Sequence, residues 1–156
     1  MALIKSVRGF TPKMRLQKAK SLLQQGWKFS ANSIQSRAGL VYFLRASVQL
    51  HDLLSTKSHK LVYGEALYYA GLTAESLREI NLWTLHEAYY ESCIRFQPYT
   101  TTAKKCYLRM EALQLASYVD GDNGFVPAAV RDHLKVLKSM AVKQDSDFLS
   151  TGGIGD

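Results

Sequence analysis

The sequence lacks any apolar run long enough to cross a bilayer, because charged or amide side chains interrupt every candidate. It is also poor in proline and cysteine, with three and two residues, which excludes a collagen and a disulfide-rich mini-protein. Hydrophobic residues make up 47% of the 156 positions and charged residues only 21%, a balance unlike that of disordered chains. We therefore expect one domain with its own core.

Acidic residues are absent from the first 51 positions, which carry nine lysines and arginines. From Asp52 onward, eleven basic residues accompany thirteen acidic ones, so the net charge of +7 originates in the first third. This asymmetry favours contact with an anionic partner, which can be an acidic protein surface, a membrane face or nucleic acid. The alternative is that the cationic side chains only solvate helix faces.

Residues 1–10 form a weakly amphipathic, basic N-terminal segment, with Leu3, Ile4 and Val7 on one helical stripe. The segment lacks the apolar core of a secretory signal and the serine and arginine density of a transit peptide. Taken as complete, the chain is expected to be cytoplasmic. If its N-terminus is a processed or trimmed end, the alternative is an organellar or exported protein.

The two cysteines, Cys93 and Cys106, lie on either side of Pro98. If one helix enters the proline and another leaves it, both sulfur atoms lie at a similar height on facing helices. We expect packed thiols of a reducing compartment, with a disulfide as the alternative. Two cysteines without further ligands at close spacing do not form a metal site.

Helical periodicity dominates the chain and no alternating strand is evident, which predicts an all-α fold. Gly26 and Gly71 are interpreted as helix ends, Thr73 as an N-cap and Pro127 as a first helical position. A helical domain is thus expected over 11–142, followed by a flexible C-terminal tail over 143–156. The expected helices cover residues 12–26, 36–54, 58–70, 74–96, 101–117 and 127–140.

These six helices form three antiparallel hairpins that begin about 43 to 47 residues apart, a spacing typical of stacked helical repeats. The middle hairpin has small, aromatic and closing residues at regular positions. They are Gly64, Gly71, Tyr90, Cys93, Ile94 and Pro98. With these residues the chain resembles the tetratricopeptide repeat family, and the resemblance implies a short α-solenoid. A helical bundle built from the same hairpins is the alternative.

The other two hairpins match the family at fewer positions, which are Gly26, Gly39, Phe43, Ala46, Ala103 and Tyr107. The chain also departs from the family pattern. About ten extra residues follow Gly71, His86 takes the place of an alanine, and the family's tryptophan is missing from each hairpin.

The resemblance further implies that the first helix of each hairpin lines a concave groove that binds peptides or partner helices. The family's groove positions correspond here to Lys13, Lys20, Leu23, Leu61, Glu65, Tyr68, Lys105 and Arg109. This mixture is cationic at both ends and apolar in the middle, so it suits an acidic segment with hydrophobic anchors. Burial of Leu23, Leu61 and Tyr68 between repeats is the alternative.

Catalytic and cofactor motifs are absent from the sequence. It contains no nucleophile elbow, phosphate-binding loop or His-Glu-x-x-His pair, and its four histidines show no ligand spacing. We therefore expect a protein that is not an enzyme and needs no cofactor or metal. The expected function is an adaptor or assembly subunit that binds an acidic and hydrophobic protein or peptide. The alternative is a nucleic-acid-associated subunit that uses the basic first third.

Overall fold

The computed structural model describes residues 11–31, 38–56, 60–77, 85–119 and 125–142. These ranges contain six helices and no strand, so the all-α prediction is confirmed for the described part of the chain. The helices are α1 (Pro12–Ala31), α2 (Ala38–Ser55), α3 (Lys60–Ser76), α4 (Leu85–Phe96), α5 (Thr101–Val119) and α6 (Ala128–Ala141). The N-terminal segment 1–10 and the tail 143–156 lie outside the described residues.

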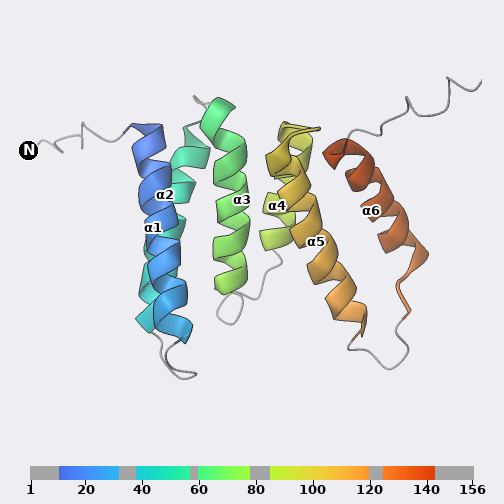
Figure 1. Ribbon diagram of the computed structural model, residues 1–156, viewed down its shortest axis with the longest axis horizontal. Coiled ribbons are helices and arrows are strands. Elements are labelled where there is room, and N and C mark those ends of the chain that lie inside the picture. Colours follow the sequence, from blue (N-terminus) through green and yellow to red (C-terminus); the bar gives the residue numbers. More distant parts are fainter. Residues whose placement is uncertain (1–10, 32–37, 57–59, 78–84, 120–124, 143–156) are drawn as a thin grey trace, which may run out of the picture.

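Consecutive helices run in opposite directions, and they follow one another along the long axis of the molecule (Figure 1). The closest pairs are α1 with α2 and α3 with α4. α1 also packs on α3, and α3 on α5, so these three helices form one row, with α6 beyond α5 at the end of the molecule. The predicted helix hairpins are therefore present.

α3 is the centre of the core because it contributes to buried clusters on both sides. Ala66 and Ala70 pack with Leu16 of α1 and Leu50 of α2. On the other side, Leu67 joins a cluster formed with α4, α5 and α6, whose largest fully buried member is Tyr90. Since α3 is covered from both directions, its position fixes the surfaces that it forms with α1 and α5.

Gly26 does not end the first helix, contrary to the sequence prediction. α1 continues to Ala31, and Gly26 lies buried inside it. A Cβ atom at this position would lie 2.4 Å from a ring carbon of Phe43 in α2. The glycine is thus needed where two helices approach closely, and not for a turn.

The boundary between the third and fourth helices was also wrong in the sequence prediction. α3 continues through Gly71 to Ser76, and a Cβ atom at Gly71 would lie 2.3 Å from the Tyr90 ring. Thr73 is buried within α3, where its hydroxyl donates to the Tyr69 carbonyl oxygen at 2.7 Å, so it is no N-cap. α4 begins at Leu85 instead of residue 74.

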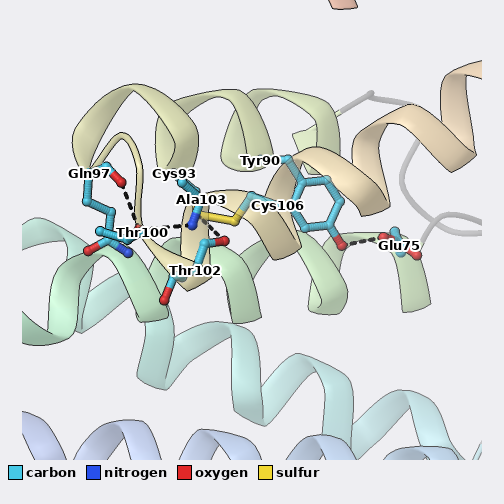
Figure 2. The surroundings of a disulfide bond; sticks show 8 residues. All are labelled: Glu75, Tyr90, Cys93, Gln97, Thr100, Thr102, Ala103 and Cys106. Carbon is cyan, nitrogen blue, oxygen red and sulfur yellow. Dashed lines mark hydrogen bonds between the residues drawn. A yellow bond between two sulfur atoms is a disulfide. The ribbon is translucent and has the colours of Figure 1, made fainter. Parts of the chain in front are cut away.

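The turn between α4 and α5 is held by a disulfide between Cys93 and Cys106 (Figure 2). The expectation of packed thiols was therefore wrong, although the facing positions of the two cysteines were predicted correctly. Thr100 caps α5, since its hydroxyl accepts the Ala103 amide at 3.1 Å and donates to the Gln97 carbonyl oxygen at 2.8 Å. Both sulfur-bearing residues are fully buried.

Candidate functional site

A groove with a volume of about 450 Å³ lies between α1 and α3. The half-buried Pro12 and Val62 supply apolar surface above the buried Leu16, and polar or charged side chains surround it. The lining residues are Thr11, Pro12, Lys13, Leu16, Gln17, Lys20, Val62 and Glu65. We call this cavity the α1–α3 groove. Its size is within the range of ligand-binding pockets.

A smaller pocket of about 120 Å³ adjoins the α1–α3 groove and shares Pro12 and Val62 with it. Leu53 of α2 and Tyr63 of α3 add apolar surface there, while Arg15 and Asp52 form an ion pair at 2.7 Å across it. An extended occupant of the groove would find room for one side chain in this pocket.

Three of the predicted partner-binding residues, Lys13, Lys20 and Glu65, line the α1–α3 groove together. Lys20 forms an ion pair with Glu65, and its ammonium group lies 4.9 Å from the centre of the Tyr69 ring. The Glu65 side chain is 40% exposed and that of Lys20 is 23% exposed. Both charges are therefore in contact with solvent, where an ion pair contributes little to stability.

α1 gives the groove its positive charge, because it carries five lysines and arginines and no acidic residue. Arg15 and Lys20 are engaged by Asp52 and Glu65. Lys13 is exposed at the groove, and no ion-pair partner is recorded for it among the described residues. Of the two lysines that line the groove, Lys13 is the more exposed and therefore the more accessible to an anion.

Arg109, another predicted residue, belongs to a closed network between α3 and α5. Its guanidinium donates to both carboxylate oxygens of Glu75, with Nε at 2.9 and 3.0 Å from them. Glu75 also accepts a hydrogen bond from the hydroxyl of Tyr90, which Figure 2 shows pointing toward it. The Glu75 side chain is only 10% exposed, and its carboxylate takes its hydrogen bonds from Arg109 and Tyr90 of the protein itself.

The pKa values of this network agree with a fully paired arrangement. Burial, and then the hydrogen bond to Glu75, raise the pKa of Tyr90 well above its usual value of 10.0. The hydrogen bond to Glu75 raises the pKa of Arg109. Tyr90 thus stays neutral and Arg109 charged, and neither is suited to transfer protons near neutral pH.

Leu23, Tyr68 and Lys105 are not among the described residues that line the groove. Leu23 is fully buried among α1, α2 and α3, so the prediction that it contacts a partner was wrong. Tyr68 is half-buried, with its ring centre 5.3 Å from that of Tyr69 and 6.2 Å from that of Tyr90. Lys105 is exposed on α5, and the side chain of Leu61 lies outside the described part of the structure.

Gln17, Leu16, Pro12 and Val62 line the groove but were not identified from the sequence. Gln17 follows Lys13 by one helical turn and precedes Lys20 by nearly another, so helical spacing alone would have placed it on the same face. Leu16 and Val62 carried no such signal, because apolar residues at these positions are equally typical of a closed core.

Metal binding and membrane crossing receive no support from the described residues. Among them, no three His, Cys, Asp or Glu side chains gather closely enough to hold a metal ion. Similarly, none of the helices in the described ranges combines the length and apolarity needed to span a membrane.

Fold and site together define an all-α protein of antiparallel helices with a basic, partly apolar groove between the first and third helices. Comparison with models of known protein families, with curated proteins and with solved structures finds no match. The functional argument therefore depends on the geometry and charge of the groove.

Proposed function

We propose that this protein is a non-enzymatic adaptor or assembly subunit, built as a short tetratricopeptide-like stack of hairpins, that binds a partner segment in the α1–α3 groove. The observation that carries the proposal is the meeting of Lys13, Lys20 and Glu65 around an open, partly apolar cavity of about 450 Å³. The partner is an acidic protein segment with one or two hydrophobic anchors.

The groove can provide both specificity and speed of encounter. The acid-free surface of α1 attracts an anionic segment and raises its association rate. The apolar surface of Pro12 and Val62 then holds a hydrophobic side chain. Because the Lys20–Glu65 pair is solvent-exposed, a partner carboxylate can take the place of Glu65 beside Lys20 at little cost.

A displayed library of random peptides, selected on the full-length protein, tests this proposal. We expect the enriched peptides to combine Asp or Glu with Leu, Ile or Phe. Lys13→Glu should weaken their binding about tenfold or more, because it reverses the charge at the groove mouth. An acidic residue near a helix N-terminus suits the helix dipole, so this variant should fold normally.

Lys28→Glu is the matched control, since it makes the same charge change near the other end of α1, outside the groove lining. It should alter association only through the net charge. Enrichment of peptides without acidic residues, or equal losses in both variants, would contradict the proposal.

Binding to nucleic acid is the result that would replace the adaptor proposal. Binding of a random-sequence RNA with a steep dependence on salt concentration, lost equally in Lys13→Glu and Lys28→Glu, would indicate phosphate contacts spread along α1. We expect weak RNA binding that does not compete with the selected peptides.

The disulfide provides an argument about the cellular compartment in which the adaptor acts. Disulfides persist mainly in oxidising compartments, so we propose such a compartment in preference to the cytoplasmic location that the sequence predicts. Protein isolated from its native cells, then unfolded in denaturant and alkylated without reductant, should show neither Cys93 nor Cys106 modified by mass spectrometry. Alkylation of both thiols under these conditions would contradict this.

A further inference from the structure

The C-terminal segment 143–156 has the chemistry that the α1–α3 groove should select. It contains Asp145, Asp147 and Asp156 against a single basic residue, Lys143. Two large apolar residues, Phe148 and Leu149, directly follow Asp147. An acidic stretch with adjacent hydrophobic anchors thus occurs in the chain itself, outside the described residues.

The N-terminal segment has the opposite character. Residues 1–10 include Lys5 and Arg8 and no acidic residue. Although this segment leads directly into Thr11 at the groove, its charge has the same sign as that of Lys13. Charge complementarity therefore favours the C-terminal segment as the occupant.

The position of α6 decides which groove the C-terminal segment can reach. α6 lies at the opposite end of the molecule from α1, separated from it by α3 and α5 (Figure 1). Packed helices lie about 8 to 10 Å apart, so the groove between α1 and α3 lies about two and a half such steps, roughly 20 to 25 Å, from α6. Phe148 is six positions beyond Val142, which corresponds to at most about 21 Å in a fully extended chain. The tail of the same chain would have to be fully extended to meet the groove, whereas the tail of a second copy carries no such restraint.

We propose that residues 143–156 of a second copy bind the α1–α3 groove, with Asp145 and Asp147 beside Lys13 and Lys20 and with Phe148 on the apolar surface of Pro12 and Val62. The inference rests on the proposed function of the groove and names a partner for it. The contact is head-to-tail, since the tail of one copy occupies the groove of the next. It leaves one groove and one tail unused at the ends of every open assembly.

Complementation between two full-length variants tests the proposal by sedimentation velocity. Lys13→Glu disables the groove and keeps the tail, whereas Phe148→Ser combined with Leu149→Ser disables the tail and keeps the groove. We expect the unmodified protein to self-associate as its concentration rises and each variant alone to stay monomeric. A mixture of the two should form dimers of one copy of each and nothing larger. Circular dichroism of both variants checks that they fold.

The other outcomes overturn the proposal. A chain that stays monomeric at every concentration shows that the tail does not bind a second copy. Self-association that persists in both variants places the contact elsewhere, for example on the exposed α2 residues Val41, Leu44 and Val48. If acidic peptides from the displayed library still bind the groove in these cases, only the inference fails. If no such peptide binds, the proposed function fails with it.

Discussion

Two carboxylates of α3, Glu65 and Glu75, each join this helix to a neighbour in the row, yet their surroundings differ. Glu65 pairs with Lys20 of α1 and keeps 40% of its side chain exposed. Glu75 pairs with Arg109 of α5, accepts a second hydrogen bond from Tyr90 and is only 10% exposed. The first pair borders the α1–α3 groove, and the second covers the fully buried Tyr90.

The row of helices therefore has an open half, at the junction of α1 with α3, and a closed half, at the junction of α3 with α5. In the open half, solvent already competes for the ion pair, so a partner can replace one of its members. In the closed half, removal of one member leaves buried polar groups without partners. Binding is therefore expected at the junction of α1 with α3, while the junction of α3 with α5, supported by the nearby disulfide, maintains the fold.

The largest expected effect on stability comes from replacing a glycine of α3 in the closed half, compared with a glycine elsewhere in the same helix. In the closed half, a Cβ atom at Gly71 would lie 2.3 Å from the Tyr90 ring, which is fully buried and has no room to move. Gly71→Ala should lower the free energy of unfolding by about 3 kcal/mol. In urea denaturation followed by circular dichroism, an unchanged midpoint would contradict the packing described for Tyr90.

Gly64→Ala provides the matched comparison in the same helix. The three atoms nearest to the added Cβ atom belong to the end of the Gln97 side chain, which can rotate away. The higher helix propensity of alanine offsets the cost by about 1 kcal/mol, so we expect little net change in stability.

A smaller difference is expected from removing the two carboxylates. Glu75→Ala leaves the Tyr90 hydroxyl buried without its acceptor and should cost about 2 kcal/mol. Glu65→Ala removes an exposed partner of Lys20 and should cost less than about 1 kcal/mol. The same urea experiment compares them, and equal costs would mean that the two ion pairs do not differ as described.

The pH dependence of stability should show the smallest effect, and it again arises in the closed half. Burial raises the pKa of Tyr90 above 10.0, so above pH 10 the unfolded chain loses this proton while the folded chain retains it. The unfolded state then binds fewer protons, and stability falls as the pH rises. Urea midpoints measured on either side of pH 10 should fall less in Tyr90→Phe than in the unmodified protein. Identical slopes would contradict this role of Tyr90.

The sequence predicted the helices and hairpins well because their apolar residues recur at helical spacing. It was wrong at Gly26 and Gly71, which are typical helix ends but are used here where helices approach closely. Thr73 failed for a related reason, since its hydroxyl bonds to a carbonyl oxygen within α3 instead of capping a new helix. The preference of glycine for helix ends is a local property, so it does not show which side chain of another helix packs against the glycine.

The candidate site was predictable only in part. Lys13, Lys20 and Glu65 lie together along the α1–α3 groove, and their role in binding a partner stays a prediction, whereas Leu23 was assigned to a partner surface and is core. The groove positions of the family indicate which helices face each other, but they do not indicate how far each side chain is buried. The burial of Glu75, and hence the closed half of the row, depends on Tyr90 of α4, which no groove position indicated.

A titration of the isotope-labelled full-length protein with the best peptide from the displayed library, followed by amide chemical shifts, tests the central claim most directly. We expect the largest shifts at Lys13, Gln17, Lys20, Val62 and Glu65, and little change at Glu75 and Arg109. Shifts concentrated at the junction of α3 with α5, or spread evenly over the molecule, would contradict an open groove between α1 and α3.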